Sequence, residues 1–298
     1  MTYPETPTTT PPDAVATATA SASVASASAS SPSSPGPRRT SSKVVSTLAI
    51  CAGAVLILGT VVTGGVSILR AASVHTGEVT ASVAGVRTLD LDASAAQVTV
   101  SFGAVSEATL RVSGGSGADD WTLGRNGDRL VVASDRDIWA RWGWLREPET
   151  VELVLPASAA GLDADLDLDS GSLRAEGDFG DLAVTLDAGS LRVTGTASDL
   201  TSEINAGSAR FDLDGVVDAR FAISAGSVDG ALTGPTPSSI VVDVSAGRLD
   251  LAVPEGAYAL TSDVSAGGFR HDLTVDPTSP HRVDVTVSAG SVVLRPAD

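Results

Sequence analysis

The sequence predicts an all-β fold: a β-solenoid-like array of repeats of 18 to 23 residues, preceded by a disordered tail and one transmembrane helix. Three observations indicate this. A pentapeptide of the type Asp-Ala-Gly-Ser-Leu recurs seven times, apolar residues flank every copy at fixed offsets, and an uncharged stretch of 26 residues precedes the array. The central residues of the seven copies are Gly171, Gly189, Gly207, Gly226, Gly247, Gly267 and Gly290.

Residues 1–43 consist mainly of Pro, Ala, Ser and Thr. Such a segment cannot bury enough apolar surface to offset the entropy that ordering would cost. We therefore expect a disordered cytoplasmic tail that acts as a spacer. A docking or phosphorylation segment is the alternative.

The uncharged run spans residues 44–69, with three basic residues closely preceding it and one directly after it. As a helix it would be about 39 Å long, enough to cross about 30 Å of hydrocarbon with some tilt. The basic bias places the N-terminus in the cytoplasm and the rest of the chain outside. A cleaved signal peptide and a lipoprotein attached at Cys51 are alternatives. The 43 residues before the apolar run and the length of the run itself favour an uncleaved single span in the cell membrane.

Residues 70–84 are small and polar and are expected to form a stalk, and residues 85–298 the extracytoplasmic β-strand-repeat domain. From Val86 onward, apolar and polar residues alternate with the period of a strand. Residues 92–99 align with residues 187–194, so Ser94 takes the place of Gly189. We interpret this segment as a degenerate first copy of the repeat.

Two apolar columns accompany the motif glycines. The residues three positions before them are Leu168, Leu186, Ile204, Ile223, Val244, Val264 and Val287, and those two positions after them are Leu173, Leu191, Ala209, Val228, Leu249, Phe269 and Val292. This pattern predicts a strand, a tight corner and a second strand in each coil. Glycine at the corner permits an approach that a Cβ would forbid. Because each coil alone buries little, stacking is obligatory.

Composition excludes several functions. The formal net charge is −17, which disfavours nucleic acid as a partner. Cys51 is the single cysteine, so no disulfide can form within the chain. The three histidines lack metal-ligand spacing, and neither a phosphate-binding loop nor a nucleophile elbow occurs. We expect no enzyme activity, no cofactor and no metal site.

An acidic strand begins the array. Its alternating carboxylates are Asp163, Asp165, Asp167 and Asp169, which a strand places on one face. Oxygen ligands of this kind suit calcium. We favour a solvated face, balanced in part by Arg174 and Arg192 at the following corners, and leave a calcium site as the alternative.

Three tryptophans, Trp139, Trp142 and Trp144, lie in the least repeat-like part of the domain. A solenoid end must be covered against edge pairing, which favours a cap. The alternative is a partner surface, because clustered exposed tryptophans often mark an interface.

The array of corners, following the strand Val151-Glu152-Leu153-Val154-Leu155-Pro156, resembles the bacterial putative-adhesin β-strand-repeat family, also called toastrack, over about residues 85–298. The resemblance implies a β-solenoid-like fold, an envelope role and a single membrane anchor, and carries over no catalytic residue. The leading hypothesis is a non-enzymatic membrane-anchored cell-envelope protein. Its solenoid would be an adhesin-like scaffold or binding surface for a protein or cell-wall partner. The alternative is a component of envelope-stress sensing or signalling.

Overall fold

The structure, a computed structural model, describes residues 77–114, 121–134 and 149–297. These residues form strands joined by short turns, with one 3₁₀ turn at Ala157–Ala159, so the predicted all-β class is confirmed for this part of the chain. The expected tail (1–43) and membrane helix (44–69) lie outside the described residues. Within the described ranges, no helix is long and apolar enough to cross a bilayer.

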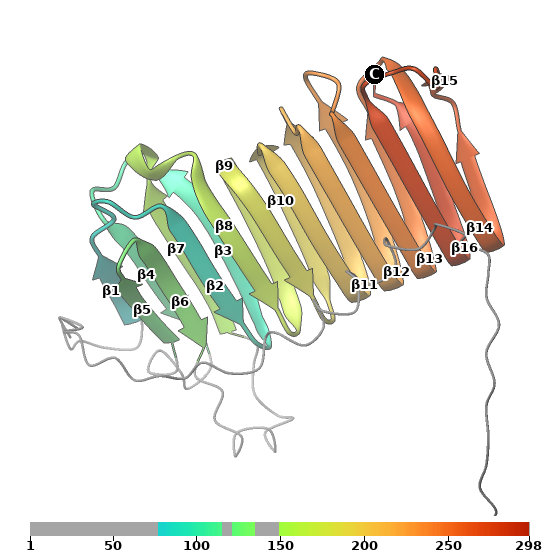
Figure 1. Cartoon of the computed structure of the whole chain (residues 1–298). Helices are drawn as coiled ribbons and strands as arrows, with labels where there is room; N and C mark the ends of the chain where they lie inside the picture. The colour runs from blue at the N-terminus through green and yellow to red at the C-terminus, as the bar shows by residue number, and fades with distance from the viewer. Residues whose placement is uncertain (1–76, 115–120, 135–148, 298) are drawn as a thin grey trace, which may run out of the picture. The chain divides into compact units, whose positions relative to one another are not determined.

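The strands are β1 (Gly77–Ala81), β2 (Thr88–Ala93), β3 (Ala96–Gly103), β4 (Ala108–Ser113), β5 (Trp121–Asn126), β6 (Arg129–Ser134), β7 (Glu149–Pro156), β8 (Leu162–Leu168), β9 (Gly171–Leu186), β10 (Ser190–Thr196), β11 (Asp199–Asp214), β12 (Asp218–Thr233), β13 (Ser239–Val253), β14 (Ala257–His271), β15 (Thr274–Val275) and β16 (Arg282–Pro296). Most pair in parallel, as Figure 1 shows.

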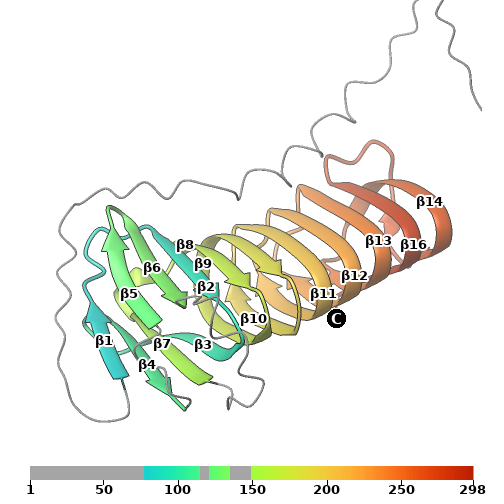
Figure 2. The ribbon, with the colours of Figure 1, turned by 90° about the horizontal axis from the view of Figure 1, so that it is seen from below.

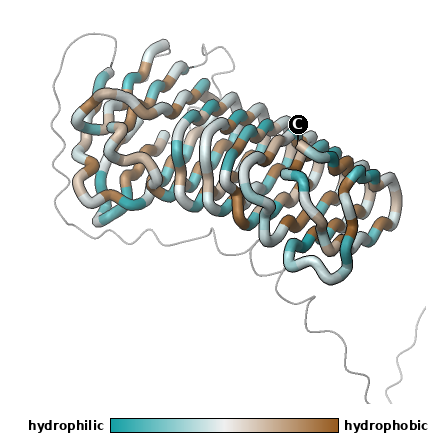
Figure 3. The backbone as a smooth tube through the Cα atoms, turned by 90° about the horizontal axis from the view of Figure 1, so that it is seen from above, coloured by the Kyte–Doolittle hydropathy of each residue, from teal (hydrophilic) through white to brown (hydrophobic). Residues whose placement is uncertain are grey.

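Each coil of the solenoid has an incoming leg before the corner and an outgoing leg after it (Figure 2). In β11, for example, the two legs meet at Gly207, and the coil stacks in register on β12, with Gly207 opposite Gly226. Side chains alternate along each leg between the interior and solvent, which Figure 3 shows as alternating hydropathy. The interior therefore lies between the two legs.

The motif glycines stack directly on one another at the corners. A Cβ at Gly189 would overlap the backbone oxygen of Gly171, and one at Gly207 would overlap that of Gly189. Gly189 also has a φ of +120°, a backbone angle that residues with a Cβ rarely adopt. At these corners the glycines allow two backbones to approach more closely than a Cβ would permit.

Both predicted apolar columns line the interior. All of their members are buried except two, Val264, which is 39% exposed, and Phe269, which is half-buried. Both exceptions belong to β14. The columns are therefore continuous through the stack and are uncovered only at this coil.

The C-terminal end of the solenoid does not follow the order of the chain. β16 lies between β13 and β14, with Val287 opposite Val244 on one side and Val264 on the other. Figure 1 shows this order. The penultimate coil of the sequence, β14, thus forms the end of the stack, and the last coil is inside it.

The N-terminal end is rearranged in the same way. β2 and β3 form one coil that lies between β8–β9 on one side and β6 and β7 on the other. This coil is a repeat, as expected, but Ala96 and not Ser94 stands opposite Gly171. The expected alignment is wrong by two residues, because backbone pairing matches Asp92 with Asp167. At the corner, Ser94 Oγ donates a hydrogen bond to Asp169 Oδ2 at 2.7 Å.

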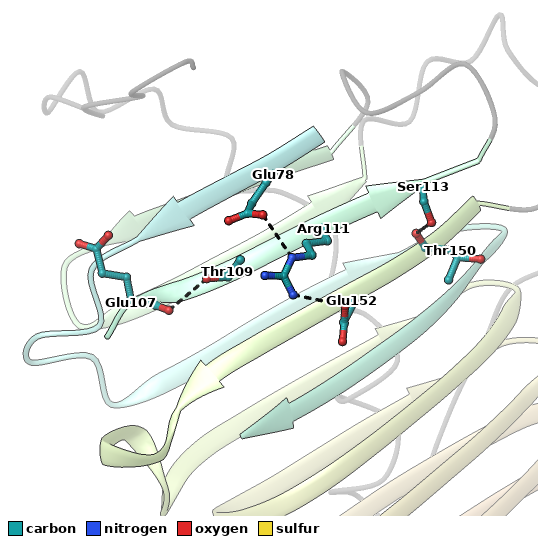
Figure 4. A network of polar contacts seen from close by, with 7 residues as sticks. All are labelled: Glu78, Glu107, Thr109, Arg111, Ser113, Thr150 and Glu152. Carbon is teal, nitrogen blue, oxygen red and sulfur yellow. Dashed lines mark hydrogen bonds and ion pairs between the residues drawn. The ribbon is translucent and has the colours of Figure 1, made fainter. Parts of the chain in front are cut away.

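Antiparallel strands complete this end. β4 pairs with β7, β1 pairs with β4, and β5 pairs with β6. β1 falls within residues 70–84, the expected stalk, so part of that segment is a strand of the domain. Arg111 on β4 joins the three outer strands through ion pairs to Glu78 on β1 (3.2 Å) and Glu152 on β7 (3.7 Å), as Figure 4 shows.

Candidate binding surface

The outer face formed by the outgoing legs carries three arginines on three adjacent strands. Arg174 on β9 stands opposite Arg192 on β10, which stands opposite Arg210 on β11. We call these residues the arginine row. Each lies three positions after a motif glycine, and all are exposed. Neighbouring strands are about 4.8 Å apart, so the stacking of coils aligns three cations across the face.

Only part of this charge is neutralised by neighbouring carboxylates. Asp212 accepts from Arg192 at 2.7 Å and from Arg210 at 3.3 Å. Among the described residues, no carboxylate forms an ion pair with Arg174. Like charges on directly opposite residues destabilise a sheet. A bound anion would offset that repulsion and form an ion pair with the guanidinium of Arg174.

An open groove of about 320 Å³ lies at Arg174 and Arg192, two members of the arginine row. Its lining comprises Gln97, Val98, Thr99, Thr150, Ser172, Leu173, Arg174, Ser190, Leu191 and Arg192. Guanidinium groups bind carboxylates and phosphates in a bidentate manner, and the amide and hydroxyl groups donate and accept hydrogen bonds as sugars require. Because the groove is open, it suits an extended anionic chain that lies across the strands.

The acidic strand lies on the other face, among the incoming legs. Asp165 on β8 stands opposite Asp90 on β2, and Asp167 stands opposite Asp92. The expected balance by Arg174 and Arg192 is wrong, since those arginines belong to the outgoing legs. Arg129 on β6, a cation of this face, pairs with Asp90 at 3.2 Å.

Burial raises the pKa of Asp167 to about 6, from an ordinary value of 3.8. A hydrogen bond with Thr185 opposes this rise, while the nearby carboxylate of Asp165 adds to it. Burial also raises the pKa of Asp165, and Asp90 raises it further. In the described part of the chain, no three His, Cys, Asp or Glu side chains are grouped so that they could hold a metal ion.

Asp167→Asn should make the domain more stable at neutral pH. The native state binds more protons than the unfolded chain between about pH 4 and pH 6, so the contribution of Asp167 to stability declines as the pH rises through this range. After allowance for solvent screening, we expect a gain of about 1 kcal/mol at pH 7, or about 2–4 °C in Tm. The gain should vanish below about pH 4.

Thermal melts of both proteins from pH 3.5 to 8 measure this difference. Glu203→Gln is the matched control, because Glu203 is an exposed carboxylate in the same cross-strand row, opposite Thr185. A Tm difference between Asp167→Asn and the unmodified protein that stayed constant over this range would contradict the assignment.

The three tryptophans Trp139, Trp142 and Trp144 lie outside the described residues, so both interpretations of them stay predictions. Trp121, on β5, is described. It is buried, and its Nε1 donates a hydrogen bond to Glu149 Oε2 at 2.9 Å. This side chain helps to close the N-terminal end of the interior.

Comparison with known proteins finds similar solved structures, among them three putative adhesion proteins. No family model and no curated protein matches the chain. A putative cell adhesion protein from Clostridium sporogenes has 10% identity and a TM-score of 0.35, with 74% of this chain and 99% of that chain covered. A putative adhesin from Bacteroides fragilis has 10% identity and a TM-score of 0.31, with coverage of 75% and 98%. A putative adhesin from Parabacteroides distasonis has 12% identity and a TM-score of 0.27, with coverage of 74% and 96%.

Proposed function

We propose that this chain is a non-enzymatic, membrane-anchored cell-envelope protein. Its extracytoplasmic solenoid is an adhesin-like scaffold that binds an anionic cell-wall polymer along the arginine row. The anchor is the apolar run of residues 44–69, and the adhesin-like role follows the resemblance of the repeat corners to the toastrack family. The observation that carries the proposal is the alignment of Arg174, Arg192 and Arg210, of which the first two line the open groove.

The stacked geometry suits a polymer better than a compact ligand. A chain that crosses the coils meets one guanidinium at each strand, at intervals of about 4.8 Å. Carboxylate or phosphate groups on such a chain would bind Arg174 first, because its charge is not neutralised by an ion pair within the described residues. The net charge of −17 repels polyanions from the rest of the surface, so binding should be confined to the row and weakened by salt.

Arg174→Gln combined with Arg192→Gln should weaken binding of the full chain to protein-free cell walls and to soluble polyglycerol phosphate. We expect the dissociation constant to rise about tenfold or more, since charge-assisted hydrogen bonds contribute about 1.5–3 kcal/mol each. Pelleting with the walls and fluorescence titration with the polymer measure this effect.

Arg248→Gln is the matched control, because Arg248 is an exposed arginine at the corner of β13, away from the row. It should leave the affinity within about twofold of the original protein. Equal loss in both variants would indicate only a general effect of charge. Absence of binding to walls and polymer by the unmodified chain would exclude this function.

A further inference from the structure

The β14 end of the solenoid presents an open strand edge. β15 pairs only with Ala257 and Tyr258, and no other described strand pairs with the outer edge of β14. Residues 261–268 are all exposed, including Val264. The sequence of β14 contains no proline, and its two charged side chains, Asp263 and Arg270, point away from the interior. This edge thus lacks the usual features that block pairing with another chain.

The interior of the solenoid is also open at this coil. Val264 stands opposite buried Val287, and Phe269 stands opposite buried Val292, so both belong to the inward columns. Unlike their equivalents in the other coils, they have no neighbour on the outer side among the strands that the structure describes. A partner that continues both columns would remove this apolar surface from water.

The shape of the coil allows a second copy of the same chain to pair with it. The incoming leg of β14 runs toward the corner at Gly267, and the outgoing leg runs away from it. A two-fold axis through the corner, perpendicular to the solenoid axis, exchanges the two legs. The incoming leg of one copy then lies antiparallel to the outgoing leg of the other on both faces at once. Such an interface is isologous, as most dimer interfaces are.

The side chains match when the two corners are aligned. Val264 then faces Phe269 of the second copy inside the solenoid, and Ser262 faces its His271, which is also an inward position because it stands opposite buried Leu294. On the outer face, Asp263 faces Arg270 of the second copy. Val264 and Phe269 form an apolar pair, Ser262 and His271 form a polar pair, and Asp263 and Arg270 bring opposite charges together. The symmetry repeats each pair.

Other registers lose this match. A shift of one residue would place inward side chains opposite outward ones. A shift of two residues keeps the faces in phase but puts Asp263 opposite Asp272 or Gly268 of the second copy. The register centred on the corner is therefore the one that satisfies packing and charge together.

We propose that two copies of this protein associate head to head through β14, forming antiparallel sheets that continue across both faces, with Asp263 of each copy paired with Arg270 of the other. The occupant of the open edge is thus a second copy of the chain. The proposal is independent of the ligand at the arginine row, and it would place two such rows in one particle.

The first test measures the mass of the full 298-residue chain in detergent by sedimentation velocity over a range of protein concentrations. We expect a monomer–dimer equilibrium. Asp263→Arg or Arg270→Asp should each raise the dimer dissociation constant about tenfold or more, because each replaces two cross-strand attractions with two repulsions. The double reversal should restore the constant to within about threefold. Glu203→Arg, on an exposed site of β11 far from this edge, is the control and should have no effect.

A second test checks the register by disulfide formation in a Cys51→Ser background. Asp263→Cys chains mixed with Arg270→Cys chains should cross-link, because facing residues on paired strands have the Cβ separation that a disulfide needs. Either variant alone should not. The proposal would be overturned if the chain stayed monomeric, or if neither charge reversal changed the dimer dissociation constant. Cross-links within one variant alone would also overturn it. A monomer whose β14 amides resist hydrogen exchange would also overturn it, since the chain itself would then cover the edge.

Discussion

Gly189→Val should unfold or severely destabilise the solenoid, while Ser190→Ala should have little effect. The valine Cβ would overlap the backbone oxygen of Gly171 in the adjacent coil, and neither backbone can retreat without breaking its strand pairing. The φ of +120° adds strain for any side chain. Together these effects should cost about 4 kcal/mol or more. Ser190 is exposed, so its loss should change stability by no more than about 0.5 kcal/mol.

Urea denaturation followed by far-UV circular dichroism measures both changes. Gly124→Ala is the matched control, because a Cβ there meets no atom within 4 Å and its φ is not positive. A small side chain should be accepted at that site. If Gly189→Val folded normally, or if Ser190→Ala abolished an activity without affecting stability, the motif would not be a structural corner.

Val287→Asp should be far more damaging than Val264→Asp, although the two valines occupy the same position of the repeat. Val287 is 1% exposed between β13 and β14, and a carboxylate there would be buried without a partner. We expect a loss of about 4 kcal/mol or more. Val264, 39% exposed at the end of the stack, should tolerate the change at a cost of about 1 kcal/mol or less.

The comparison is a direct test of the coil order. In a solenoid wound in the order of the chain, Val287 would lie at the open end and Val264 inside, so the two effects would be reversed. Melting of both variants should be followed at protein concentrations where the chain is monomeric, so that any effect of Val264 on self-association does not enter. Equal destabilisation by both substitutions would contradict the inserted position of β16.

Much of the fold could be predicted from local rules. The glycine spacing, the apolar columns and the polar residues between them repeat in every coil, so each copy reinforces the same interpretation of the others. The offset of three from the motif glycine also brings Arg174, Arg192 and Arg210 together once stacking in register is assumed. That alignment is the signal that could have identified the arginine row.

Other features of the site depended on which strands become neighbours. The carboxylates of β8 were expected to be balanced by Arg174 and Arg192, but these lie on the other legs, and β2 and β6 contribute the actual neighbours Asp90 and Arg129. β2 and β8 are separated by about 70 residues in the chain, and no local pattern links them. The raised pKa of Asp167 follows from the same long-range pairing.

By itself, the sequence determined what a coil is: two legs, a glycine corner and an interior of Val, Leu and Ile. It did so because these features depend on contacts that are the same in every repeat. Only the tertiary structure decided the order of the coils at the two ends. The apolar columns of the coils are nearly equivalent, so each coil can stack on any other. The connection over residues 272–281 is long enough to bring the chain back to β13, and β16 therefore lies beside β13 and leaves β14 at the edge. The exposed edge of β14, through which we propose that two copies associate, follows from this order and not from the repeat.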